Sequence, residues 1–285
     1  MSCATLMRSL RPRPGRWWNL TKLSLRDAAF LPPLIGIAAN WREVWAARAS
    51  QDAPPVRLRN GQTVFHSGYG WEVIGLLNEV HHTRIYDQQL GDLIDGGVIV
   101  DIGANIGVVT MNYLSRYPNA VVQAYEPNPR TYRILEQNIA ARSLSGRARL
   151  WNEAVGRSPG TISLTSAGPS TLFSAYTKAD NPVEVVEARL IDLNQVVRRC
   201  ESYGKPIKIV KIDTEGAEAD ILEGAANASL QMVSQFVIEY HDAFVPGARS
   251  RCVARLEDAG FRCNSRPIAS QPGVGMIYAV NQHAR

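Results

Sequence analysis

The sequence VIVDIGANIG, residues 98–107, joins an apolar run to a turn that contains two glycines. A near-continuous run of Val and Ile is typical of a parallel strand that helices cover on both faces. Glycines directly after such a strand let the backbone approach a ligand at the N-terminus of the following helix. The stretch therefore predicts the strand, turn and helix that open a nucleotide-binding α/β domain.

Downstream of this stretch, short apolar runs alternate with amphipathic stretches, which is the rhythm of β-α-β units in a parallel sheet. The expected strands are 98–102, 121–125, 148–155, 207–212, 235–240 and 276–280, and the expected helices are 103–117, 131–142, one from about 217, and 249–259. Two runs, 161–164 and 183–190, interrupt the rhythm and predict a hairpin excursion. We therefore predict an α/β fold with a Rossmann-like sheet and helices on both faces over residues 91–285.

Residues 1–90 predict an accessory segment of helices and a β-hairpin. Asn60-Gly61 separates the apolar runs 56–58 and 63–65, and both residues tolerate the positive φ of a two-residue hairpin turn. Residues 76–90 have the apolar spacing of a helix. The segment also contains the tryptophans Trp17, Trp18, Trp41 and Trp45. We expect these aromatic rings to pack on the main domain, although they would also suit a peripheral membrane contact.

The composition excludes several classes of protein. Of the 285 residues, 45% are hydrophobic and 20% are charged, which is typical of a folded globular chain. Much of the net charge of +5 comes from arginines before residue 17, so the sequence indicates no basic face for nucleic acid. The longest apolar run, 28–39, is shorter than the roughly 20 residues of a membrane-spanning helix. The four cysteines form no C-x-x-C pair, and we expect a cytoplasmic protein without a disulfide framework.

Asp101 argues against a dinucleotide ligand. The turn lacks the third glycine of the G-x-G-x-x-G pattern, and it places a carboxylate where a diphosphate would approach. Like charges repel in a desolvated crevice, so a ligand with an ammonium group suits this position better. We therefore expect Asp101 to meet the ammonium of S-adenosylmethionine, in a turn whose other cofactor-binding residues are Gly103, Ala104, Asn105 and Gly107.

The ends of the next two strands complete the expected cofactor site. Glu126 ends the second strand, where an acidic side chain accepts hydrogen bonds from the two ribose hydroxyls. The following turn contributes Pro127 and Asn128. The third strand ends near the expected position of adenine, and the candidate contacts there are Asn152, Glu153 and Ala154.

Five elements of the chain together resemble the FkbM family of methyltransferases. They read VDIGANIG at 100–107, YEPN at 125–128, NEAV at 152–155, VKIDTEGAE at 210–218 and IEYH at 238–241. The resemblance covers about residues 79–241, and its most specific element is K-I-D-x-E-G-x-E. It implies a class I methyltransferase sheet with an antiparallel last strand. It also implies S-adenosylmethionine as cofactor and, usually, O-methylation of hydroxyls on sugars, glycolipids or polyketide-type products.

Asp213, Glu215 and His241 are the candidate catalytic residues. Asp213 and Glu215 follow the fourth core strand and His241 follows the fifth, at the edge of the sheet where ligands bind in open α/β folds. His is suited to accept the proton that a hydroxyl loses at neutral pH. Asp213 also serves as a candidate cofactor contact. Asp213, Glu239 and His241 would alternatively suit Mg²⁺, but no compact metal-ligand motif is present and we predict no metal site.

The sequence thus predicts an S-adenosylmethionine-dependent O-methyltransferase that works by in-line displacement with base assistance. The expected partner is a small-molecule or glycolipid hydroxyl acceptor, and a homo-oligomer is left open. Two alternatives remain at this stage. A nucleotide-sugar oxidoreductase would bind NAD, and a non-catalytic protein would bind the cofactor without turnover.

Overall fold

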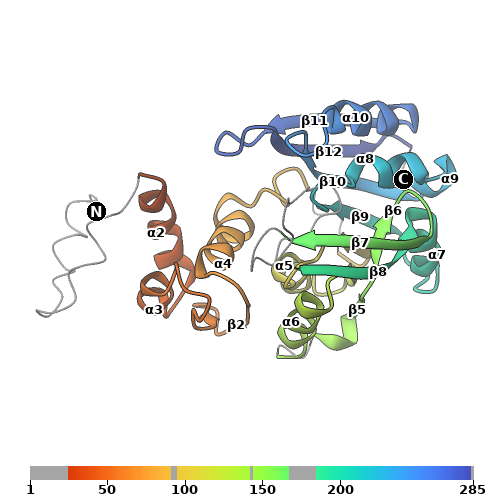
Figure 1. Ribbon diagram of the computed structural model, residues 1–285. Coiled ribbons are helices and arrows are strands. Elements are labelled where there is room, and N and C mark those ends of the chain that lie inside the picture. Colours follow the sequence, from red (N-terminus) through yellow and green to blue (C-terminus); the bar gives the residue numbers. More distant parts are fainter. Residues whose placement is uncertain (1–24, 91–94, 142–143, 167–183, 284–285) are drawn as a thin grey trace, which may run out of the picture.

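The computed structural model describes residues 25–90, 95–141, 144–166 and 184–283 (Figure 1). The N-terminal arginines, Cys3, Trp17 and Trp18 lie outside the described residues. Within the described residues, no helix combines the length and the apolar character that crossing a membrane requires.

A seven-stranded sheet in the order β11-β12-β10-β9-β3-β4-β5 forms the centre of the molecule. Its strands are β3 (Val98–Ile102), β4 (Val121–Tyr125), β5 (Ala148–Trp151), β9 (Ile207–Ile212), β10 (Val233–His241), β11 (Phe261–Pro267) and β12 (Val274–Asn281). The five neighbouring strands β10, β9, β3, β4 and β5 pair in parallel. β12 pairs antiparallel with both β10 and β11. The predicted α/β fold with a Rossmann-like sheet is confirmed, and the last strand is antiparallel as the resemblance implied.

Helices cover both faces of this sheet. Alternate residues of each strand point to opposite faces, so each strand contributes side chains to both layers of the core. Ile99, Val122 and Ile209 are buried on one face with α5 (Val108–Arg116) and α6 (Pro129–Ala140). The neighbouring strand residues are buried on the other face, against a second set of helices. That set contains α7 (Leu193–Glu201), α8 (Glu218–Gly224), α9 (Asn227–Gln231) and α10 (Ala248–Asp258). Burial on both faces explains why the strands read as continuous apolar runs.

The predicted strand 148–155 is wrong in one respect, because it is divided between two sheets. After β5, β6 (Ala154–Gly156) joins a small sheet of order β6-β8-β7, with β7 (Gly160–Ser166) and β8 (Glu184–Asp192) antiparallel to each other. The chain turns at Asn152, whose amide donates to the carbonyl oxygens of Glu126 and Pro127 at 2.8 and 2.9 Å. The expected hairpin excursion is confirmed as β7 and β8.

The N-terminal elements lie beside the carboxyl edge of the large sheet (Figure 1). They are α2 (Leu25–Ile37), α3 (Trp41–Ala46), β1 (Val56–Arg57), β2 (Thr63–Val64), α4 (Gly70–Leu77) and the π-helix η2 (Asn78–Thr83). The hairpin at Asn60-Gly61 is confirmed, with Gly61 at φ +84°. The helix expected over 76–90 instead begins at Gly70, widens into η2 and stops at Arg84, whose φ of +54° ends the helical path.

These N-terminal elements share a hydrophobic core with the large sheet. Leu34 and Trp45 belong to the same buried cluster as Ile99 and Met111. Phe30 and Trp71 contact each other edge to face, with ring centroids 6.3 Å apart. The described part of the apolar run 28–39 therefore packs within the protein. The predicted boundary at residue 90 does not separate two hydrophobic cores, because residues on both sides of it belong to the same buried cluster.

Candidate active site

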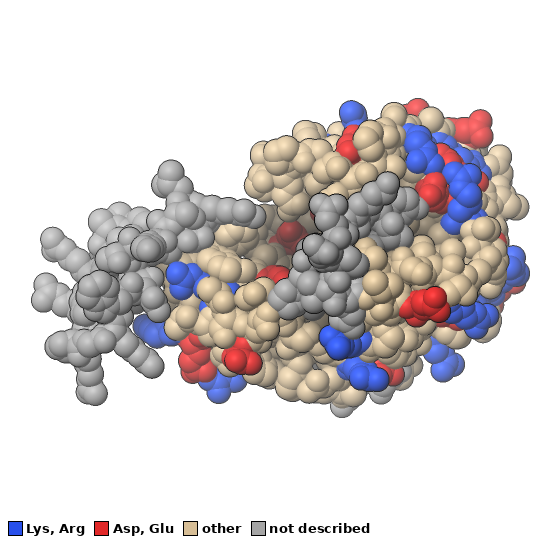
Figure 2. Space-filling view, in the orientation of Figure 1, with Lys and Arg blue, Asp and Glu red and all other residues tan. Residues whose placement is uncertain are grey.

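A cavity of about 410 Å³ opens at the carboxyl ends of β3, β4, β9 and β10. Its other walls come from α4, η2 and the small sheet, so the N-terminal segment and the main sheet both line it. Figure 2 shows acidic side chains within this hollow. The cavity has two chemically different ends, a glycine-containing loop beside Glu126 and a group of carboxylates beside His241.

The loop after β3 is held close to the strand β9. Gly103 has φ +76°, and a Cβ at this position would overlap the carbonyl oxygen of Asp213. Its neighbour Asn105 also has a positive φ, +50°, and its backbone N–H donates to Glu126 Oε2 at 2.9 Å. Gly103, Ala104 and Asn105 all line the cavity, as the sequence predicted. Only glycine fits the first of these positions because both the φ angle and the close approach exclude a side chain.

Glu126 is held rigidly at the end of β4. Its Oε2 accepts the N–H of Asn105 and its Oε1 accepts the N–H of Asn128, each at 2.9 Å. Burial raises the pKa of Glu126 to about 7, against the lowering effect of these two backbone donors. A carboxylate oxygen has two acceptor directions, so each oxygen can accept one further hydrogen bond from the cavity.

Asp101 does not line the cavity, and this corrects the contact expected from the sequence. Its side chain is completely buried, its Oδ1 lies 3.1 Å from Lys211 Nζ, and its Oδ2 accepts from Thr110 Oγ1 at 2.6 Å. Lys211 also donates to the carbonyl oxygen of Gly103 at 2.7 Å. Asp101 lies directly opposite Lys211 in the pairing of β3 and β9. Its charge is therefore balanced inside the protein, beneath the cavity in which it was expected to meet the ammonium group.

Three other predicted cofactor residues lie outside the cavity lining and support it. A Cβ on Gly107 would lie 2.5 Å from the side chain of Leu135, which places Gly107 in the contact between α5 and α6. Asn128 caps α6 by accepting the N–H of Arg130 at 2.8 Å. Asn152 holds the turn described above.

Pro127, Glu153 and Ala154 line the cavity as predicted. Glu153 forms ion pairs with Arg189 at 3.1 Å and with Arg199 at 2.5 Å. Its negative charge is thus already balanced by two guanidinium groups. The surface beside it is apolar where Ala154 and Pro127 contribute to the wall.

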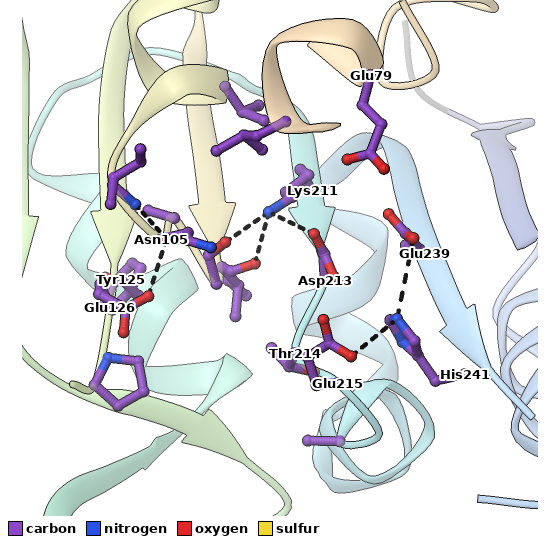
Figure 3. Close-up of a pocket in the computed structure, with 18 of the residues that line it drawn as sticks. Glu79, Asn105, Tyr125, Glu126, Lys211, Asp213, Thr214, Glu215, Glu239 and His241 are labelled. Carbon is purple, nitrogen blue, oxygen red and sulfur yellow. Dashed lines mark hydrogen bonds and ion pairs between the residues drawn. The ribbon is translucent and has the colours of Figure 1, made fainter. Parts of the chain in front are cut away.

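The predicted catalytic residues are brought together at the other end of the cavity (Figure 3). One ligand atom each of Asp213, Glu215 and His241 lies within 4.8 Å of the other two. Glu239 points to the same place from β10, and its Oε1 lies 4.0 Å from His241 Nε2. Two pairs of groups, one directly after β9 and one at the end of β10, therefore converge on one small volume.

The surroundings of His241 raise its pKa, which argues against its expected role as a base. Its Nδ1 lies 3.0 Å from Glu218 Oε1 and its Nε2 lies 3.4 Å from Glu215 Oε2. Burial lowers the pKa of His241, but the hydrogen bond and charge of Glu218 and the charge of Glu215 raise it further, to about 10. An imidazole that is already protonated cannot accept a second proton.

Glu79 was not found by the sequence analysis. It lies on η2 and points toward Glu239 and Asp213 from the opposite wall (Figure 3). Burial, followed by the charges of Asp213 and Glu215, raises the pKa of Glu79 to about 7. No local signal distinguishes Glu79 from other glutamates of a helix, because its neighbours in space come from β9 and β10.

Tyr86 and Lys211 are two further residues that the sequence analysis did not assign. The Tyr86 hydroxyl lies 2.7 Å from Glu239 Oε2 and 3.0 Å from Asp213 Oδ2, and its ring is almost fully buried. Lys211 Nζ lies 3.5 Å from Asp213 Oδ2. The K-I-D spacing was quoted for the family resemblance, and alternation in β9 places both ends of that triplet on the same side of the strand.

The chain is similar in sequence to known methyltransferases. The profile of the methyltransferase FkbM domain matches residues 101–263. The 31-O-demethyl-FK506 methyltransferase FkbM of Streptomyces tacrolimicus is 30% identical over 235 residues, which cover 72% of this chain and 88% of that protein.

Two further relatives are also methyltransferases. Methyltransferase sdnD of Sordaria araneosa is 29% identical over 214 residues, covering 65% of this chain and 81% of the relative. The hexuronic acid methyltransferase AglP of Haloferax volcanii is 28% identical over 176 residues, covering 62% and 68%. With the matched profile spanning more than half of its length, the chain belongs to the FkbM family of methyltransferases.

Proposed function

We propose that the chain transfers the methyl group of S-adenosylmethionine to a hydroxyl of an acceptor, by in-line displacement with base assistance. The observation that carries this proposal is Glu126, a carboxylate fixed by two backbone N–H groups at the end of β4 and facing the cavity beside the Gly103 loop. Such a group accepts the two hydroxyl hydrogens of a ribose.

The residues of the cavity fit this cofactor. Glu126 would hold the ribose, and the apolar surface of Pro127 and Ala154 would face the base. Asp213 replaces Asp101 as the acidic group for the ammonium, because Asp213 lines the cavity with its side chain 21% exposed whereas Asp101 is buried beneath it. When bound, S-adenosylmethionine supplies an electrophilic methyl group, and the chain supplies orientation and a proton acceptor.

Glu79 is the proton acceptor in this proposal. Its pKa of about 7 leaves it substantially ionised at neutral pH, which is the condition for efficient general base catalysis. Asp213, Glu215 and His241 surround the acceptor oxygen and orient it. This assignment keeps the three predicted residues at the catalytic end and moves the base function from His241 to Glu79.

The acceptor class proposed is a hydroxyl of a sugar, glycolipid or polyketide-type product. One relative is named for 31-O-demethyl-FK506, an oxygen position, and another for a hexuronic acid. The cavity wall from α4 includes Trp71 and Leu76, which offer apolar surface to the carbon skeleton of an acceptor. The carboxylates opposite offer hydrogen-bond acceptors for its hydroxyls.

Calorimetry tests the cofactor assignment directly. We expect S-adenosylhomocysteine to bind the wild-type chain and Glu126→Gln to bind it at least about tenfold more weakly, since an amide cannot accept both ribose hydroxyls as a carboxylate does. Glu136→Gln, an exposed carboxylate on α6, is the matched control and should bind as the wild type does. Binding of NAD with no binding of S-adenosylhomocysteine would overturn the proposal.

Mass spectrometry tests the transfer itself. An extract incubated with the protein and a labelled methyl donor should yield a labelled product whose methyl group is on oxygen. Absence of labelled product across hydroxylated acceptors, together with normal cofactor binding, would favour the non-catalytic alternative.

A further inference from the structure

The geometry points to a divalent cation site of the Mg²⁺ or Mn²⁺ class, formed by Asp213, Glu215 and His241 at the acceptor end of the cavity. The inference rests on the proposed function, because it places the ion where the acceptor hydroxyl binds. It goes beyond that function by adding an ion that would hold the acceptor oxygen.

The spacing of the three side chains fits one ion. A carboxylate oxygen and an imidazole nitrogen each bind such ions at about 2.0–2.2 Å, so two ligands of the same ion lie at most about 4.4 Å apart. The three ligand atoms lie within 4.8 Å of one another. Shifts of a few tenths of an ångström in side chains would close the site.

His241 is oriented in the manner of a metal ligand. Metal-binding histidines usually donate their second ring N–H to a carboxylate, which fixes the ring and directs the other nitrogen to the ion. Here Nδ1 faces Glu218 Oε1 at 3.0 Å, and Nε2 faces Glu215 and the cavity. This arrangement directs Nε2 toward the ion.

Glu218, which orients the ring of His241, is itself held firmly by backbone hydrogen bonds. Its side chain is fully buried, and its Oε1 accepts hydrogen bonds from the N–H of Thr214 at 3.1 Å and the N–H of Gly216 at 3.0 Å. The same oxygen also accepts from Thr214 Oγ1 at 3.2 Å. A carboxylate with this many donors stays in place, so the ring of His241 is held in one orientation.

Carboxylates outnumber basic groups at this end of the cavity, which favours the binding of a cation. The described carboxylates gathered there are Glu79, Asp213, Glu215, Glu218 and Glu239, and the basic groups among them are Lys211 and His241. Lys211 is already engaged by Asp101 at 3.1 Å. A divalent ion at this place would offset the excess of negative charge among these groups.

The ligand set favours a hard ion that keeps open positions. Two carboxylates and one imidazole leave about three sites of an octahedral ion for water or an acceptor hydroxyl. An ion in this place would lower the pKa of the bound hydroxyl. Glu79, on the opposite wall and outside the ligand set, remains available to accept the proton.

Mn²⁺ is the probe for the test, because its binding can be measured calorimetrically and its ligands identified by electron spin echo spectroscopy. The full chain is first freed of metal with a chelator. We expect Mn²⁺ to bind the wild type with a nitrogen coupling from the imidazole of His241. Glu215→Gln and His241→Gln should each weaken binding at least about tenfold, and the second should abolish the coupling. Glu72→Gln, another carboxylate that lines the cavity, is the control and should retain both.

Affinity for S-adenosylhomocysteine is measured on the same samples and separates the possible failures. Unchanged affinity shows that a variant is folded, and Glu215, with its side chain 25% exposed, is the variant least disturbing to the core. No Mn²⁺ binding, binding without nitrogen coupling, or equal binding by Glu215→Gln would overturn the cation site while the proposed function stands. Loss of S-adenosylhomocysteine binding by the wild type would overturn the proposed function, whatever Mn²⁺ does.

Discussion

The pair of Asp101 and Lys211 illustrates how one buried charge changes the interpretation of a motif. Both side chains are at most 1% exposed, with their charged atoms 3.1 Å apart. Burial lowers the pKa of Lys211, but the charges of Asp101 and Asp213 raise it further, so the amine stays protonated. A buried ion pair of this kind supports the loop above it, and removal of one partner leaves an uncompensated charge.

Asp101→Asn should therefore lower the free energy of unfolding by about 3–5 kcal/mol, because Lys211 loses its buried partner. Denaturant unfolding measures this change. The double variant Asp101→Asn with Lys211→Met should recover much of the loss, since it removes both charges. Unchanged stability together with weak binding of S-adenosylhomocysteine would instead support a direct contact between Asp101 and the ligand ammonium.

Glu79 makes a prediction about pH. Because its pKa is raised to about 7, the carboxylate is protonated below that pH and cannot accept a proton, so kcat should fall as the pH falls through about 7. A bound cation would move this limb to lower pH, since positive charge lowers the pKa of a neighbouring acid. Glu79→Gln should lower kcat about 10²-fold at pH 8 and remove the limb, as measured from kcat against pH.

His241→Gln is the control for this pH profile. The pKa of His241 is about 10, so its protonation does not change between pH 6 and pH 8 as Glu79 titrates. The limb near pH 7 should therefore persist in this variant at its reduced activity. A limb that survives in Glu79→Gln and vanishes in His241→Gln would return the base function to His241.

At the scale of elements, the π-helix η2 decides which face of the N-terminal segment reaches the cavity. An extra residue per turn breaks the regular helical spacing, and such segments are frequent at functional sites. η2 continues directly from α4 and carries Glu79 over the carboxyl ends of β9 and β10 (Figure 3). The strands supply the other acidic groups, so neither the N-terminal segment nor the sheet alone forms the acidic end of the cavity.

The contact between α5 and α6 makes a prediction about stability. Gly107 starts α5 with φ +87°, and a Cβ would press on Leu135 of α6. Gly107→Ala should destabilise the fold by about 1–3 kcal/mol, from backbone strain and crowding, without changing the affinity for S-adenosylhomocysteine. Thermal unfolding and calorimetry measure the two quantities. Lost affinity at unchanged stability would make Gly107 part of the cofactor site, as the sequence had indicated.

At the scale of the whole molecule, the N-terminal segment and the sheet share one core. Trp45 is 4% exposed and contacts Trp71 edge to face with ring centroids 5.3 Å apart. Trp45 belongs to the buried cluster that contains the sheet residue Ile99, and Trp71 packs against that cluster. A shared core predicts that the described parts unfold together.

Trp45→Ala should lower the free energy of unfolding by about 3–5 kcal/mol in a single cooperative transition, because a large buried ring leaves a cavity. Denaturant unfolding followed by two spectroscopic probes measures this. Met232→Ala, an exposed apolar residue, should have little effect. A separate early transition confined to the N-terminal segment would show that it is an independent domain.

The sequence by itself determined most of the strands and helices from residue 98, the hairpin at Asn60-Gly61, and the family. These features are local, because the periodicity of apolar residues and the φ preferences of Gly and Asn depend on near neighbours in the chain. The polar edge strand β11 and the five-residue helix α9 were missed, since their short mixed patterns carry little periodic signal. The helix α7 was also missed, although its buried residues Leu193, Val196, Val197 and Cys200 recur at helical spacing.

Only the tertiary structure decided which charged groups face the cavity and which are balanced beneath it. Tyr86 and Glu239 are 153 positions apart in the chain and form a hydrogen bond, and Lys211 reaches Asp101 from a neighbouring strand. Burial and neighbouring charges, which no local pattern records, set the protonation of Glu79 and His241. The physical reason is that the charge state of a side chain depends on the groups that surround it in space. The local path of the backbone, in contrast, depends largely on residues that are close in the chain.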